Sequence, residues 1–186
     1  MDLAWDDHRT RKFVTTIGLI TSDGPYGRNV MAAEWAYHVS YAPSLIVACI
    51  GQNKATAENI KKTKMFGVSI AASDQSIIAS VAGGSSGKNV DKINVLKDMG
   101  IEFYEGAKVK VPLVKNAAMN AECKLVKSIN LGDHIMFVGE VVEIVASSRE
   151  PIVYHNSKYW KFGEQVQKPS PEMLGNIGKL VEKHQK

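Results

Sequence analysis

Three polar stretches of this sequence have residue types and spacings that suit anion binding or proton transfer. The first is Asn53-Lys54-Ala55-Thr56, which follows an apolar run and precedes a segment with helical periodicity. Free backbone N–H groups at a helix start attract phosphate, and Lys54 and Thr56 add a positive charge and a hydroxyl. Capping of the helix by Asn53 or Thr56 is the commoner use of such residues, so these residues alone favour capping over phosphate binding.

The second stretch, Gly83-Gly84-Ser85-Ser86-Gly87-Lys88, has the composition of a phosphate-binding P-loop but not its order. A P-loop needs Gly and then Ser or Thr at positions that hold Ala82 and Asn89 here. The segment is therefore expected to be a mobile loop that lines a ligand site, with a plain connector as the alternative.

The third stretch is Gly132-Asp133-His134, which opens the longest apolar strand expected in the chain. A histidine at a barrel rim can donate a hydrogen bond to a ligand or transfer a proton, although such residues more often only hydrogen-bond at a strand end. The five histidines lie far apart without HxH or HExxH spacing, so a metal site is not expected.

The elements that position these stretches alternate strands with short helices and then become almost entirely β. Strands are expected at 14–22, 30–40, 45–50, 66–70, 121–126 and 134–146, with a hairpin at 152–162 turning at Asn156-Ser157. Helices are expected at 53–64, 74–81 (with Ile77, Ile78 and Val81 inward), 91–99 and about 171–184, the last opened by Ser170-Pro171-Glu172. Many short strands with few helices favour a mainly β, closed antiparallel barrel in a single domain, 1–186.

Composition narrows the functional classes. The chain has 186 residues, a formal charge of +4 and a pI near 9.0, which suits anionic ligands but lacks the basic stripe of a nucleic-acid-binding protein. Residues 1–12 are polar and no apolar run is long enough to cross a membrane, so neither secretion nor membrane insertion is expected. Cys49 and Cys123 are expected to be reduced, buried thiols of a cytoplasmic protein.

In their order along the chain, four segments resemble the flavin reductase-like family of FMN-binding split barrels, over roughly residues 10–165. The segments are Asn29-Val30-Met31-Ala32-Ala33-Glu34-Trp35, Lys54-Ala55-Thr56-Ala57-Glu58-Asn59-Ile60, Ser86-Gly87-Lys88-Asn89-Val90-Asp91-Lys92 and Gly132-Asp133-His134-Ile135-Met136-Phe137-Val138-Gly139-Glu140-Val141. Each motif alone is weakly specific, and their joint order and spacing carries the resemblance.

The resemblance implies a six-stranded Greek-key split barrel that forms a homodimer, with FMN bound near the dimer interface. It implies that Lys54 and Thr56 bind the phosphate, with help from Asn53 because Ala55 replaces a hydroxyl residue common in the family. The implied flavin-binding residues are Asn29, Met31, Ala32, Ala33, Glu34 and Trp35 beside the ring, Ser86, Gly87 and Lys88 over it, and Asp91 and Lys92 as anchors of that loop. His134 is implied to lie near the reactive face, whereas the orientation of Glu34 stays open.

The function implied is that of an oxidoreductase, in which NADH or NADPH reduces FMN and electrons pass to a ferric chelate, a flavin or a partner protein. Two alternatives differ in class. One is a flavoprotein that only carries electrons or stores flavin, and the other is a β-barrel module that binds nucleic acid through its mild positive charge.

Overall fold

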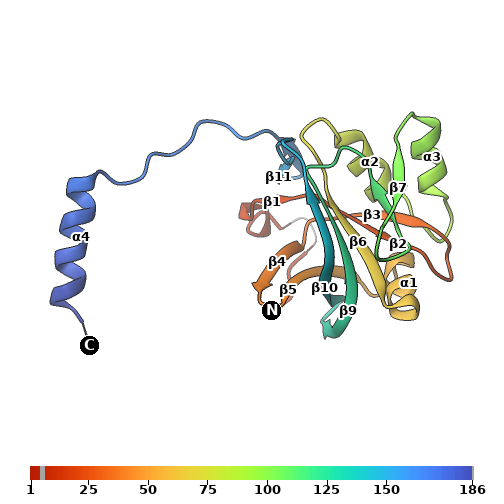
Figure 1. Cartoon of the computed structure of the whole chain (residues 1–186), viewed down its shortest axis with the longest axis horizontal. Coiled ribbons are helices and arrows are strands. Elements are labelled where there is room, and N and C mark those ends of the chain that lie inside the picture. The colour runs from red at the N-terminus through yellow and green to blue at the C-terminus, as the bar shows by residue number, and fades with distance from the viewer. Residues whose placement is uncertain (5–6, 186) are drawn as a thin grey trace.

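A seven-stranded antiparallel sheet forms most of the computed structural model, which describes residues 1–4 and 7–185 (Figure 1). In spatial order its strands are β3 (Asn29–Ala33), β2 (Gly18–Ser22), β6 (Met65–Ile70), β9 (Met119–Leu131), β10 (His134–Ala146), β5 (Ser44–Gly51) and β4 (Ala36–Tyr41). Two smaller sheets accompany it. One contains β1 (Thr15–Thr16), β11 (Val153–His155) and β12 (Lys158–Trp160), and the other contains β7 (Phe103–Glu105) and β8 (Pro112–Val114).

The connection between β3 and β4 forces this sheet to close on itself. The two strands lie at opposite edges of the sheet, yet only Glu34 and Trp35 separate them in the chain. The edges must therefore approach each other near this junction, where the Trp35 carbonyl accepts from the Cys49 N–H at 2.9 Å and so continues the β4–β5 ladder back toward β3. A side chain on Gly18 of β2 would come within 2.6 Å of the Ala36 Cβ, so glycine permits this close approach.

Four short helices and a 3-10 turn complete the chain: η1 (Thr10–Lys12), α1 (Ala55–Thr63), α2 (Ser76–Gly84), α3 (Lys92–Asp98) and α4 (Pro171–Lys183). The interior of the barrel is filled by apolar side chains that include Ile20, Phe66 and Phe137. A second cluster, with Leu19, Ile78 and Leu96, packs α2 and α3 against the outside of the sheet. Leu19 and Ile20 are neighbours on opposite faces of β2, so this strand is buried on both sides.

The expectation of a mainly β antiparallel split barrel is confirmed. So are the hairpin turning at Asn156-Ser157, where both residues have positive φ, and the C-terminal helix, whose Ser170 side chain accepts from the Met173 N–H. Several boundaries were wrong. The strand expected at 30–40 is two strands divided at Glu34-Trp35, which makes seven strands instead of six, and the strand expected at 14–22 is divided at Ile17.

The segment after α2 also differs from expectation. Gly83 and Gly84 belong to the helix and not to a loop, and Gly83 lies beside β3, where a Cβ would be in ordinary contact with that of Ala32 at 3.5 Å. Ile77 was expected to point inward but is 46% exposed, whereas Ile78 is fully buried. Cys49, expected to be buried, is only partly so.

The C-terminal segment stands apart from the barrel. Residues 156–185 are exposed throughout, and Figure 1 shows an extended tether carrying α4 away from the sheet. None of the helices in the described part of the chain is long and apolar enough to span a membrane.

Candidate functional site

The start of α1 meets the start of β3 through a buried hydrogen bond. The Asn29 side-chain amide donates to the Thr56 hydroxyl at 2.8 Å, and both side chains are buried. The alternative that Thr56 or Asn53 caps α1 is not seen. The N-cap position is Lys54, no side chain caps it, and Asn53 lies exposed in the preceding turn. The first N–H groups of α1 therefore keep their capacity to bind an anion.

The glycine-rich loop after α2 rests directly on Asn29. A Cβ at Gly87 would come within 2.3 Å of the Asn29 side-chain oxygen, so only glycine fits at this point of the loop. Lys88 turns toward the segment before β3, with its ammonium 5.2 Å from the centre of the Tyr26 ring. Ser86 stabilises the loop through its hydroxyl, which accepts from the Lys88 N–H at 3.2 Å.

Lys92 supplies a buried cation near the exposed Lys54. Only 2% of Lys92 is exposed, and its ammonium donates to the Ala82 carbonyl at the end of α2 at 2.8 Å. Burial, together with repulsion from Lys54, lowers the pKa of Lys92 to about 8. Asp91 caps α3 by accepting from the Asn94 N–H at 3.0 Å and so fixes the backbone from which Lys92 projects. The two cations repel each other, and an anion bound between them would offset this repulsion.

The turn between β5 and α1 connects this basic site to the His134 strand. The Lys54 side chain lies against Gly51, with its Cε 3.5 Å from where a Cβ would be. Gln52 donates from its side chain to the Gly132 carbonyl at 2.6 Å and from its backbone to the Asp133 carbonyl at 3.2 Å. Lys54 and His134 are thus held by the same turn.

His134 sits between an acid and an aromatic ring. Its Nδ1 is 2.7 Å from the Asp133 carboxylate, which can only accept, so the proton is on Nδ1 and Nε2 faces elsewhere. This hydrogen bond lowers the pKa of Asp133. The Trp35 ring lies 4.8 Å from the imidazole, centre to centre. The arrangement gives an oriented imidazole with one nitrogen free for a ligand.

Glu34 is only partly exposed to solvent. It is half-buried, and desolvation raises the pKa of its carboxyl. Burial first, and then the nearby Glu34 and Cys49, raise the pKa of Tyr37. These three side chains therefore form one polar group beside the junction of β3 and β4.

The strand β3 offers a free edge between these two regions. It is the first strand in the order of the sheet and pairs with β2 along its other side, from Asn29 to Ala33. Every second residue of this segment, which runs from Met31 to Ala33, points its N–H and C=O groups away from β2, so these groups are available for hydrogen bonds to a planar ligand.

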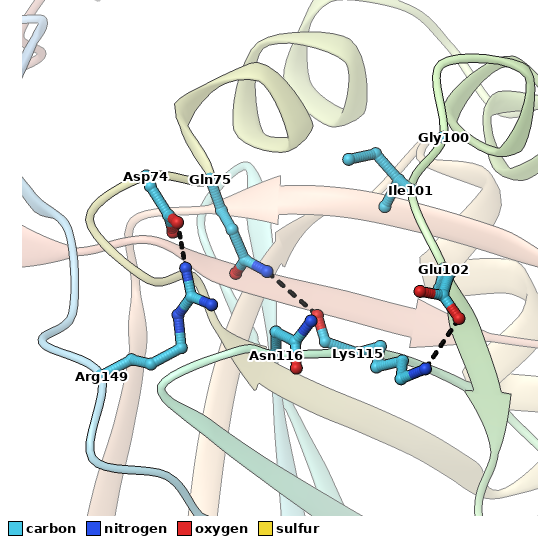
Figure 2. A pocket seen from close by; sticks show the side chains of 8 residues that line it. All are labelled: Asp74, Gln75, Gly100, Ile101, Glu102, Lys115, Asn116 and Arg149. Carbon is cyan, nitrogen blue, oxygen red and sulfur yellow. Dashed lines mark hydrogen bonds and ion pairs between the residues drawn. The ribbon is translucent and has the colours of Figure 1, made fainter.

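Two cavities are present in the described part of the chain, one away from these groups of residues and one bordering the basic site. A cavity of about 210 Å³ near Gln75 and Lys115 has its polar groups satisfied internally (Figure 2). Lys115 pairs with Glu102 at 2.7 Å, Arg149 pairs with Asp74, and Gln75 donates to the Lys115 carbonyl. The two cations and the two carboxylates that line this cavity are paired with each other, so the cavity offers little to a charged ligand.

The second cavity, of about 190 Å³, lies on the outer side of the glycine-rich loop and borders the basic site. Its lining residues are Tyr26, Gly27, Arg28, Gly87, Lys88, Asn89, Val90 and Asp91. Gly87 is the residue shared between this cavity and the Asn29 contact.

The fold thus gathers most of the residues singled out from the sequence into two linked groups. Asn29, Lys54, Thr56, Gly87 and Lys92 surround the start of α1, whereas Glu34, Trp35 and His134 surround the β3–β4 junction. Asn53 and Lys88 stand at the periphery.

Sequence reasoning did not single out Gln52 and Asp133 as site residues, although both orient the His134 turn. Asp133 lay inside a recognised motif, but nothing in the sequence distinguished Gln52. In the described residues, no group of three or more His, Cys, Asp or Glu side chains is arranged to hold a metal ion.

The fold defines an antiparallel split barrel in which two lysines near the start of α1 lie next to an edge strand of the sheet. Residues 10–163 match the family described as flavin reductase like domain, and the chain belongs to this family. A protein of Archaeoglobus fulgidus is 34% identical over 116 residues, which are 62% of this chain and 64% of that protein. The matched region therefore spans slightly less than two thirds of that relative's length.

Two further comparisons cover more of the chain. The reductase component of a 4-nitrophenol 4-monooxygenase/4-nitrocatechol 2-monooxygenase from Rhodococcus opacus is 26% identical over 153 residues, covering 81% of this chain and 76% of that protein. The solved structure of the flavin reductase PheA2 in its native state is 27% identical and superimposes with a TM-score of 0.74. This superposition covers 88% of this chain and all of that one.

Proposed function

We propose that this chain is an FMN-dependent oxidoreductase, a flavin reductase that takes reducing equivalents from NADH or NADPH and delivers them to an acceptor. The observation that carries the proposal is the uncapped start of α1 at Lys54, with Lys92 near enough to be repelled by it. The same turn is hydrogen-bonded through Gln52 to the Gly132-Asp133 turn that precedes His134. A flavin mononucleotide has a dianionic phosphate at one end and a planar, hydrogen-bonding ring at the other, and the two groups of residues match these ends.

The residues present fit the phosphate. Lys54 and the first N–H groups of α1 lie together, and Lys92 is near enough to Lys54 to be repelled by it; a dianion bound between the two lysines would relieve that repulsion. Thr56 is held by Asn29, so its hydroxyl still has a proton to donate. Ser86 and Gly87 close the position from the loop side, anchored by Asp91.

The β3–β4 junction fits the ring. The free edge of β3 supplies backbone donors and acceptors from Met31 to Ala33, and Trp35 supplies an aromatic wall. Bound FMN would supply the hydride chemistry itself. The protein's contribution is orientation: His134, held by Asp133, presents Nε2 to the nicotinamide or to the ring edge.

The acceptor and assembly are part of the same proposal. The relative from Rhodococcus opacus is a reductase component, which supports delivery of reduced flavin or electrons to a partner protein. We propose a homodimer as the working form, because β4 is an edge strand with an exposed apolar face. Both thiols are free, which suits a reducing compartment such as the cytoplasm.

The test is to titrate the purified chain with FMN and then mix the loaded protein with NADH or NADPH under anaerobic conditions. We expect saturable quenching of flavin fluorescence, followed by bleaching of the flavin absorbance within seconds with at least one nucleotide. Quenching without bleaching would favour the electron-carrier alternative. Absence of both would reject the proposal.

A further inference from the structure

The helix α4 lies outside the part of the chain that the family match explains. That match ends at residue 163, whereas α4 begins at Pro171 and is joined to the barrel by an exposed tether. The role of this segment must therefore be inferred from its own residues.

The helix α4 is too weak to persist without a partner surface. It has 13 residues, among them Gly175 and Gly178, and glycine is the poorest helix former after proline. Isolated helices shorter than about 12 to 15 residues are marginal in water even with favourable sequences. Its good N-cap, Ser170, and the Pro at the first turn define where the helix starts but add little to its length.

One side of α4 is apolar and uncovered. The side chains on it recur at helical spacing and are between 43% and 59% exposed; they are Met173, Leu174, Ile177, Leu180 and Val181. The opposite side carries Glu172, Lys179 and Glu182 together with both glycines. An amphipathic stripe of this width is typical of a helix that packs on a protein surface.

The barrel has a matching uncovered surface on its edge strand β4. Large exposed side chains follow one another here: Trp35 just before the strand, then Tyr37, Val39 and Tyr41, of which Tyr41 is 91% exposed. Because the ladder with β5 shifts register between His38 and Ser40, Tyr41 lies on the His38 side of the strand, with the two rings 4.8 Å apart. If a buried aromatic side chain contributes about 150 to 250 Å², Trp35 and Tyr37, which share one side, offer on the order of 400 Å² per copy. A stable interface buries about 800 Å² per partner. Pairing through β4 alone is therefore too small, and a stripe the size of α4 supplies the missing area.

The direction of the tether decides which body α4 covers. Figure 1 shows the tether leaving the barrel near β11 and carrying α4 far beyond the side on which β4 lies. A second copy docked on β4 would stand between the barrel and α4.

We propose that residues 164–183 form an exchanged arm, in which the apolar side of α4 packs on a second copy of this chain whose β4 face meets the first. The inference rests on the homodimer in the proposed function, but it does not depend on the redox reaction. The arm folds fully only when the second copy is present, so α4 couples its own helix formation to dimerisation.

The test is hydrogen–deuterium exchange of α4 in the FMN-loaded full chain, measured at concentrations above and below the dimer dissociation constant found by analytical ultracentrifugation. We expect α4 amides to be protected in the dimer and to lose at least tenfold of that protection on dissociation. Where dilution does not dissociate the dimer, the double variant Val39→Asp, Tyr41→Asp makes the monomer. Equal protection of α4 in monomer and dimer would mean that α4 docks on its own barrel, and it would overturn the proposal. Exchange of the α4 amides at the unprotected rate in the dimer would also overturn it, and so would a chain that is monomeric at every concentration.

A matched pair of variants tests the apolar stripe. Leu174→Glu with Leu180→Glu is expected to raise the dimer dissociation constant at least tenfold, whereas Lys179→Glu on the other side, with the same change in net charge, leaves it within twofold. Equal effects of the two variants would overturn the proposal. The flavin absorbance of each sample tests the proposed function separately from the exchanged arm. A chain that binds FMN normally but leaves α4 unprotected would support the proposed function and reject the exchanged arm.

Discussion

Lys92 is the side chain whose environment an incoming anion changes most. The Lys92 side chain is almost fully buried, and its ammonium has one carbonyl partner at 2.8 Å. Burial and the second lysine nearby both disfavour the charged form of this ammonium. Its pKa is lowered to about 8, chiefly by burial and then by Lys54. A phosphate dianion beside it would favour the charged form and raise that pKa again.

A pH dependence of FMN binding follows. The free protein loses the Lys92 proton as the pH rises through about 8, whereas the complex retains it, so binding above pH 8 takes up a proton. We expect the FMN dissociation constant to be nearly constant between pH 7 and 7.5. It should then rise, by up to about tenfold per pH unit, to pH 9.5. Fluorescence titrations across this range measure it.

The control is Lys61→Met, on the exposed part of α1, which should retain the wild-type slope. Lys92→Met should bind FMN more weakly at pH 7 and show a flatter profile above pH 8. An unchanged slope in Lys92→Met would mean that another group takes up the proton.

Gly87 gives a second prediction at this scale. A methyl group there would lie 2.3 Å from the Asn29 side-chain oxygen, so Gly87→Ala must displace either the loop or the Asn29–Thr56 hydrogen bond. We expect FMN affinity to fall about tenfold, the equivalent of about 1.4 kcal/mol. Gly84→Ala is the matched control, because a Cβ there meets open space. If both variants bind FMN alike, the contact with Asn29 does not shape the site.

Residue types along the sequence indicated the anion site but not its construction. The pair Lys54 and Thr56 was visible as a helix-start pattern, and capping was its simpler interpretation. The deciding facts are long-range: Asn29 reaches Thr56 across 27 residues of sequence, and Lys92 approaches Lys54 from α3. Burial of a lysine has no local signature, because it depends on which helices pack over it.

Among the elements, the loop between β7 and β8 depends on one carboxylate. Glu122 on β9 is buried and accepts the backbone N–H groups of Ala107, Lys108 and Val109 at 2.7, 2.6 and 2.8 Å. Gly106 passes so close that a Cβ would lie 2.8 Å from this carboxylate. The negative charge therefore holds the loop that leads into β8 against the barrel.

Glu122→Gln should destabilise the fold without removing the anion site. A neutral amide turns one acceptor into a donor that faces N–H groups, which costs about 2 to 3 kcal/mol. For a chain of this size that corresponds to a fall in Tm of roughly 4 to 12 °C, measurable by differential scanning calorimetry. Glu140→Gln, on an exposed position of β10, should shift Tm by less than about 2 °C. Similar shifts for both variants would deny Glu122 its anchoring role.

Element types were largely predictable, whereas their ends were not. The hairpin at Asn156-Ser157 and the start of α4 follow from local turn and cap chemistry, and both were predicted. Alternation from 30 to 40 continues through Glu34 and Trp35 without a break, so it could not reveal that the chain changes edge there. The interruption is imposed by closure of the sheet, which is not a local property.

For the molecule as a whole, closure of the barrel is what assembles the site. The two edges of the sheet meet at Glu34-Trp35, and this junction brings the free edge of β3 next to the turn that holds Lys54 and His134. The participating segments begin at residues 29, 54, 87, 92 and 134, so no single stretch of chain contains the site. Ligand binding should therefore stabilise the entire barrel and not one element.

The last prediction measures this coupling. FMN at 100 times its dissociation constant should add about 2.7 kcal/mol to stability, which for this size raises Tm by roughly 5 to 11 °C. Riboflavin, which has the same ring without the phosphate, should raise Tm much less at equal concentration, because it leaves the Lys54–Lys92 repulsion in place. Lys54→Ala should reduce the difference between the two ligands while leaving the unliganded Tm nearly unchanged, since Lys54 is exposed. Equal Tm shifts for FMN and riboflavin would place the phosphate outside the basic site. A difference in Tm shift that Lys54→Ala removes would show that the stabilisation of the whole barrel by FMN depends on one charge at the start of α1.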